Sequence, residues 1–294
     1  LVRGEPPVPT STLTDLLEEG SDLRAAYHAS DPLVLRGAVA LDGLPRVDDI
    51  LALIDGSLLR RPYFSVLQEG LAPSDSEVLA TREVAGTRVD GFIDPVGVGR
   101  HLADGATLKL NQVEDWHPFL RDVNDALDAV FPAESKAFLF YTPAGKRGML
   151  PHRDGSRVIA VQLQGAKEWH LYDTPPEAGA GLDVDTSKEQ VVVLEPGDLL
   201  YLPHGTGHAA TAVDRASLHV TFTLTEPPPS ALAQAYIDEW IASGRPAEAG
   251  RGATSALARA AALLADLKDF AAGVDGATLV DRALTTARLR DGSR

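Results

Sequence analysis

Short strand-like segments follow one another through residues 132–226, and they are the feature that most restricts the fold. Between them stand turn residues, as in Glu195-Pro196-Gly197-Asp198, where Pro and Gly take the central turn positions. Strands this short and this regularly spaced are typical of an antiparallel sandwich or barrel. We therefore expect a mainly β core. The seven predicted strands are 137–141, 158–163, 168–172, 191–194, 198–202, 209–213 and 217–223.

Helical patterns lie on both sides of this β region. Before it, apolar spacing predicts helices at 12–28, 48–59 and 116–131, short strands at 33–35 and 63–68, and a loop-rich stretch up to about residue 105. After the stiff Pro227-Pro228-Pro229 break, the Ala-rich sequence predicts helices at 232–242, 255–270 and 277–289. The expected organisation is one domain at 1–226, with a mixed part at 1–131 and a barrel at 132–226, and a helical module at 227–294.

The charge of the chain limits its partners. A net charge of −15 argues against nucleic acid, because phosphate binding needs Lys and Arg. The charge is compatible with a basic peptide substrate and equally with plain solubility. No apolar run approaches the roughly 18 residues of a membrane span, and no signal peptide is recognisable. A soluble cytoplasmic protein without membrane or nucleic-acid partners is the expectation.

Three side chains in the β region have the spacing of a metal site. His152 and Asp154 are two residues apart, so on one strand they point the same way, and a second strand can bring in His208. Two imidazoles and one carboxylate occupy one face of iron(II) and leave the opposite positions open. The chain has no Cys, so only nitrogen and oxygen ligands are available. The pattern predicts an iron site at His152, Asp154 and His208.

Other interpretations of these histidines stay open at this point. Any single histidine is more often a surface or hydrogen-bonded residue than a ligand. His204 and His208 have a spacing that a zinc pair can use. We favour His208 alone, because His204 follows Pro203 in an expected turn while His208 begins the next strand.

Lys167 is the candidate for a separate anion site. By alternation it shares a strand face with Trp169 and Leu171. If that face is inward, the ammonium needs an anion, because burying an unpaired charge is costly. A carboxylate of 2-oxoglutarate would serve. The alternative is a solvent-exposed face with no such role.

Several motifs together resemble the JmjC-type, cupin-fold oxygenases of the ribosomal-oxygenase group. The resemblance runs from about Leu33 to Thr225. Its motifs are Tyr141-Thr142-Pro143-Ala144-Gly145, Gln164-Gly165-Ala166-Lys167-Glu168-Trp169, Leu194-Glu195-Pro196-Gly197-Asp198 and Ser217-Leu218-His219-Val220-Thr221. It implies a double-stranded β-helix core, a jelly roll of the cupin and JmjC type, with helical additions.

The resemblance also implies a chemistry. Iron(II) would be bound by His152, Asp154 and His208, and the co-substrate 2-oxoglutarate would place its far carboxylate on Lys167. His219 and Tyr141 match positions near the co-substrate. The implied reaction is hydroxylation of a protein or peptide side chain, with 2-oxoglutarate converted to succinate. Because the third ligand is a carboxylate, no site is freed for halide, so we expect hydroxylation rather than halogenation.

Departures from the family leave the substrate open. Phe138 stands where Asn is usual, and Arg153 with Gly155-Ser156-Arg157 replaces the usual segment, which we expect at the substrate mouth. Members with a winged-helix ending differ here, where the tail suggests a dimerisation bundle and a homodimer. The alternatives are the same chemistry on a small molecule or peptide natural product, and a cupin-like binding protein without turnover.

Overall fold

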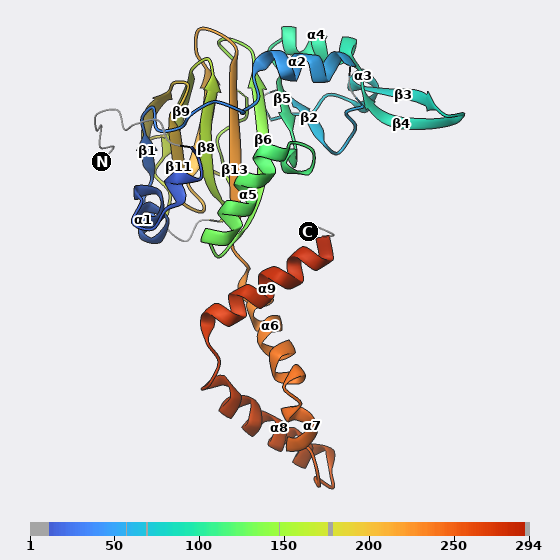
Figure 1. Cartoon of the computed structure of the whole chain (residues 1–294), viewed down its shortest axis with the longest axis vertical. Helices are drawn as coiled ribbons and strands as arrows, with labels where there is room; N and C mark the ends of the chain where they lie inside the picture. The colour runs from blue at the N-terminus through green and yellow to red at the C-terminus, as the bar shows by residue number, and fades with distance from the viewer. Residues whose placement is uncertain (1–11, 57, 69, 147, 176–178, 292–294) are drawn as a thin grey trace. The chain divides into compact units, whose positions relative to one another are not determined.

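The computed structural model describes residues 12–56, 58–68, 70–146, 148–175 and 179–291. These residues form two compact units (Figure 1). The first unit takes the described residues up to Phe131 and then Ser135–Thr225. The second takes Pro132–Glu134 and the described residues from Glu226 onward.

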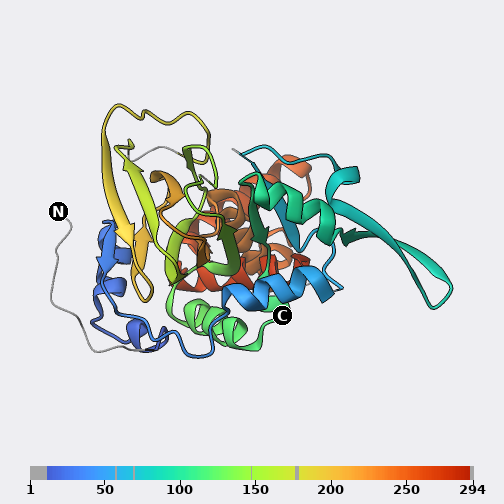
Figure 2. The ribbon, with the colours of Figure 1, turned by 90° about the horizontal axis from the view of Figure 1, so that it is seen from above.

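A seven-stranded sheet is the larger of two sheets in the first unit. The interior strand β8 is buried at every position from Val158 to Leu163, because both of its faces are covered. Helices α2 and α5 lie on one face of this sheet (Figures 1 and 2), and the smaller sheet lies on the other. The strand order is β1 (Leu33–Leu35), β11 (Leu199–Leu202), β8 (Arg157–Gln164), β13 (Ser217–Thr225), β6 (Glu134–Thr142), β5 (Thr107–Leu110) and β2 (Phe64–Leu67).

The smaller sheet faces β8 and its neighbours across an apolar core. Its order is β10 (Glu189–Leu194), β9 (Lys167–Tyr172), β12 (Gly207–Ala212) and β7 (His152–Arg153), with antiparallel pairing throughout. Two facing antiparallel sheets built from these strands form the double-stranded β-helix that the sequence predicted. All seven predicted strands are present.

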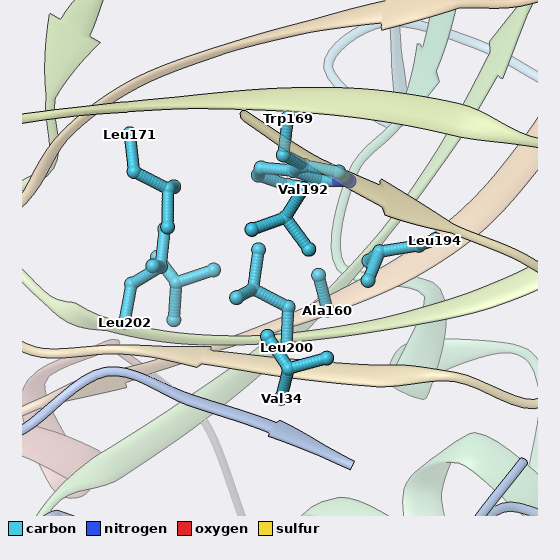
Figure 3. Packing of buried hydrophobic residues seen from close by; sticks show 9 residues of the cluster. Val34, Ala160, Trp169, Leu171, Val192, Leu194, Leu200 and Leu202 are labelled. Atoms are coloured by element: carbon cyan, nitrogen blue, oxygen red, sulfur yellow. The ribbon is translucent and has the colours of Figure 1, made fainter. Parts of the chain in front are cut away.

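The core between the sheets is concentrated toward β9 and β10. Trp169 and Val192 of the smaller sheet pack against Ala160 and Leu200 of the larger one (Figure 3). Each large apolar side chain buried in this way contributes about 1.5–3 kcal/mol relative to exposure. The packed half of the sandwich leaves the other half, near β7 and β12, for polar side chains.

Helices complete the first unit. The longest, α5, begins after His117, whose ring accepts a hydrogen bond from the Leu120 amide, and it buries Leu120, Val123 and Leu127. The predicted helix at 12–28 is wrong as one element: Gly20 at φ 84° separates a 3₁₀ turn from α1. The helices and turns are η1 (Asp15–Leu17), α1 (Asp22–Ala29), α2 (Val47–Gly56), α3 (Asp75–Val78), α4 (Pro95–Ala103), η2 (Val113–Asp115) and α5 (Pro118–Val130).

A β-hairpin replaces part of the predicted loop-rich region. Strands β3 (Leu79–Val84) and β4 (Thr87–Ile93) pair around Ala85 and Gly86, whose φ angles of 49° and 78° suit a two-residue hairpin turn. The hairpin projects beyond the larger sheet (Figure 1). The prediction of a loop was wrong because both strands are largely exposed and so lack an alternating apolar pattern.

The second unit is helical, with the three predicted helices and a short extra one, α7. Trp240 Nε1 donates to Asp266 at 2.7 Å, and the Arg245 guanidinium meets the same carboxylate at 2.8 Å. None of the helices in the described part of the chain has the length and apolarity needed to cross a bilayer. The helices are α6 (Pro229–Ala242), α7 (Arg245–Ala249), α8 (Ala256–Ala271) and α9 (Gly276–Asp291).

Candidate metal centre and its cavity

Two paired strands bring the three predicted metal ligands together. His152 lies on β7 directly opposite His208 on β12, and Asp154 follows β7 by one residue. One ligand atom from each of the three lies within 4.8 Å of the others. An Asp154 carboxylate oxygen is 3.8 Å from His152 Nε2, and its second oxygen is 3.6 Å from His208 Nε2. This is the convergence that the sequence spacing predicted.

Backbone carbonyls orient both imidazoles toward the cluster. His152 Nδ1 is 2.8 Å from the Leu150 carbonyl, and His208 Nδ1 is 3.0 Å from the Thr206 carbonyl. A carbonyl only accepts, so each Nδ1 carries the proton and each Nε2 presents a lone pair. Burial, together with His152 beside it, lowers the pKa of His208 and keeps that ring neutral. The three donors therefore suit a ferrous ion in charge, chemistry and position.

A cavity of about 220 Å³ opens at the ligand cluster. Its walls combine aromatic side chains, among them Phe140 and Trp169, with a few polar groups, among them Lys167 and His219. An apolar wall with a few converging polar groups is typical of a small-molecule site.

Lys167 is buried in this cavity, so the solvent-exposed alternative is wrong. The residue is only 2% exposed. Its Nζ donates hydrogen bonds to Thr142 Oγ1 and to His219 Nδ1, each at 3.1 Å. Burial lowers the pKa of Lys167 to about 7. Within the described residues the ammonium has no carboxylate partner, so a bound anion would supply the missing charge.

A known domain family covers this site. The family model described as the JmjC domain matches residues 114–232, which contain all three ligands and Lys167. The match covers less than half of the chain. The matched segment begins just before α5 and ends in α6.

Curated relatives match the same part of the chain. A protein of Drosophila sechellia is 31% identical over 145 residues, which cover 46% of this chain and 22% of that protein. One of Dictyostelium discoideum is 34% identical over 143 residues, which cover 45% of this chain and 28% of that protein. Both are named bifunctional lysine-specific demethylase and histidyl-hydroxylase NO66. The match thus spans less than a third of the length of either relative.

Solved structures share the fold. Escherichia coli ycfD superposes with a TM-score of 0.56 at 17% identity, covering 91% of this chain and 70% of that one. A second structure, titled as the ribosomal oxygenase YcfD with cobalt and 2-oxoglutarate, gives a TM-score of 0.51 at 17% identity, covering 81% and 59%. At this identity the likeness concerns the fold.

The structure places the two remaining predicted co-substrate residues differently. His219 lines the cavity, stacks on Phe140 at 4.8 Å, and has a pKa well below its usual value, mainly because it is buried. Tyr141 is not among the cavity residues. On β6 the side chains alternate, so Phe138, Phe140 and Thr142 face inward while Tyr141 does not. Thr142, which the sequence prediction missed, accepts a hydrogen bond from Lys167 Nζ.

Arg153 and Arg157 do not line the central cavity, which corrects their predicted place at its mouth. Arg153 donates to the carbonyls of Gly179 and Asp183, and so holds the loop that precedes β10. Arg157 lies over the Tyr27 ring at 4.2 Å and donates to the Tyr201 hydroxyl at 2.9 Å.

His204 is exposed and lies on a separate groove together with Arg157 and Lys188. It does not join the ligand cluster, which argues against a zinc pair with His208.

Two further cavity residues were missed. Lys109 of β5 lines the wall, and the buried Trp169 indole N–H has no hydrogen-bond partner in the described chain. Trp169 was predicted only as an inward neighbour of Lys167. Nothing in the local sequence around Lys109 marks it, because its neighbours in the cavity lie on strands far along the chain.

Proposed function

We propose that this chain is an iron(II)- and 2-oxoglutarate-dependent oxygenase that hydroxylates a side chain of a protein or peptide. The observation that carries the proposal is the presence of two matched groups in one cavity. The His152, Asp154 and His208 cluster can hold a ferrous ion, and Lys167 can hold a carboxylate. When bound, iron and 2-oxoglutarate supply the oxidative chemistry: oxygen is consumed, carbon dioxide and succinate leave, and one oxygen atom enters a C–H bond of the substrate.

The protein would contribute position and exclusion of water. His152, Asp154 and His208 would hold the ion and leave positions open for the co-substrate and oxygen. Lys167, held by Thr142 and His219, fixes the distant carboxylate of the co-substrate. Aromatic walls keep the site dry, which strengthens each of these charge interactions.

The names of the relatives guide the first search for a substrate. Matching proteins are named for histidyl hydroxylation and lysine demethylation, and a structurally similar protein is titled a ribosomal oxygenase. We therefore propose a protein side chain as substrate. Ribosomal proteins are the first pool to incubate with the iron-loaded chain and 2-oxoglutarate.

Mass spectrometry of that pool tests the proposal. We expect one or more peptides to gain one oxygen atom, with succinate released in step. The Asp154→Ala variant is the matched control and should give neither product. Succinate release that no protein, peptide or small molecule stimulates, and that Lys167→Ala leaves unchanged, would instead indicate a binding protein of this fold.

The proposal extends to assembly and location. Helix α8 has no buried residue, and Leu257 and Leu264 on one of its faces are 82% and 68% exposed. Leucines seven residues apart on a helix form a stripe that a second copy can cover. We infer a homodimer through the C-terminal helices. Since ferrous iron and 2-oxoglutarate are supplied inside cells, the cytoplasm is the inferred location, which cell fractionation would test.

A further inference from the structure

A second lysine faces the same cavity as Lys167. Lys109 lies on β5, opposite Phe140 of β6, and its partly buried ammonium sits over two rings. Nζ is 4.3 Å from the centre of the Phe138 ring and 5.4 Å from that of Phe140. Ring faces attract a cation but accept no full hydrogen bond. In the described chain, Lys109 has no hydrogen-bond or ion-pair partner.

The acidic group that interacts electrostatically with Lys109 is Asp154, one of the three proposed metal ligands. Burial lowers the pKa of Lys109, and the negative charge of Asp154 opposes that shift. A dication bound by Asp154 would take up this negative charge. Metal loading therefore leaves the Lys109 ammonium without the charge that offsets it in the metal-free chain.

The charges of the loaded cavity do not balance without a further anion. A metal dication with Lys167 and Lys109 carries four positive charges. Asp154 and the dicarboxylate 2-oxoglutarate carry three negative ones. Both carboxylates of the co-substrate already have partners, one in Lys167 and the other in the metal. One positive charge remains, and it is that of Lys109.

We propose that Lys109 is a specificity-determining residue that binds the carboxylate of an acidic side chain of the primary substrate. The inference rests on the proposed function, because it takes the metal and co-substrate as bound. It also reverses the preference for a basic substrate that the net charge of the chain suggested. The surface of the molecule is acidic overall, whereas this wall of its cavity is basic.

Peptide selection tests the proposal. The protein is loaded anaerobically with cobalt(II) and 2-oxoglutarate, immobilised, and exposed to a random pentapeptide pool. We expect wild type to enrich Asp or Glu over Lys and Arg by about tenfold, the effect of one charge pair in a desolvated site. Lys109→Gln should lose this enrichment, and Lys109→Glu should favour basic peptides. Lys268→Gln, which removes an exposed lysine of α8, is the control and should behave as wild type.

Binding of the co-substrate separates the two sources of a carboxylate. By calorimetry with cobalt(II) present, Lys109→Gln should change the affinity for 2-oxoglutarate by no more than about twofold. A loss of about tenfold or more would assign Lys109 to the co-substrate and overturn the proposal. Thermal unfolding of each variant checks that the fold is kept.

Two further outcomes distinguish a failure of the proposed oxygenase function from a failure of the inference on Lys109. Should wild type bind neither cobalt(II) nor 2-oxoglutarate, the proposed oxygenase function itself fails. Should it bind both and yet show no preference for acidic peptides, or keep that preference in Lys109→Gln, the inference on Lys109 alone is wrong.

Discussion

Asp154 is the residue on which the metal site depends most directly, because it supplies the carboxylate that faces both imidazoles. Asp154→Ala should weaken cobalt(II) or iron(II) binding by more than about 100-fold, since losing even an outer partner of a metal ligand costs 10–100-fold. Calorimetry under anaerobic conditions measures this. Asp214→Asn, which changes an exposed turn carboxylate, should bind the metal as wild type does. Equal binding by Asp154→Ala would reject the triad.

Lys167 makes co-substrate binding depend on pH. In the free protein burial lowers the pKa of Lys167 to about 7, whereas a bound carboxylate raises it, so binding takes up a proton above pH 7. The affinity for 2-oxoglutarate should fall as pH rises from 7 to 9, by up to about tenfold per pH unit. Lys167→Met should bind more weakly and show little pH dependence in this range. Calorimetric titrations across the range measure both effects, and parallel profiles would show that Lys167 does not hold the carboxylate.

At the scale of elements, the turn between β8 and β9 positions Lys167. Gly165 has φ 68°, and a side-chain carbon there would lie 2.2 Å from the Ala216 carbonyl oxygen. Gly165→Ala should therefore destabilise the protein by about 1–3 kcal/mol. Gly99→Ala, inside α4 where the space is open, should instead stabilise by about 0.5–1 kcal/mol. Urea unfolding compares the two, and equal stabilities would contradict the strain at Gly165.

Elements also show where sequence reasoning succeeds. The strands were predictable because short β-rich runs alternate with turn residues, and the triad was predictable from the His-x-Asp spacing and the third histidine at the start of a later strand. The β3–β4 hairpin was not, since exposed strands need no apolar pattern. Thr142 and Lys109 were missed for a different reason: they reach the cavity only through the lateral order of β5, β6 and β13, and that order is set by packing across the whole sheet.

The exposed leucines of α8 bear on the number of chains that the whole molecule contains in solution. If α8 forms the dimer contact, replacing both Leu257 and Leu264 with Glu should give a monomer, because it places charges on the apolar stripe. Size-exclusion chromatography with light scattering measures the mass. Leu182→Glu, which changes an equally exposed leucine of the first unit, should leave the mass unchanged. A dimer that survives the double substitution would place the contact elsewhere.

The first unit could be foreseen from the sequence in its architecture and its metal ligands, but not in the use of its arginines. Arg153 and Arg157 are charged residues next to the ligand motif, and the sequence placed them where a substrate enters. Their actual partners are loop carbonyls and an aromatic ring that lie far along the chain. Long basic side chains pack and form hydrogen bonds with whichever groups the fold places near them.

One ligand of the metal site sits on a strand only two residues long, at the outer margin of the smaller sheet. So short a strand gains little from its own ladder of hydrogen bonds. An ion bound by both His152 and His208 would cross-link β7 and β12. Metal binding would then stabilise this edge of the barrel. Metal loss would let the same edge unfold locally before the rest of the sandwich unfolds.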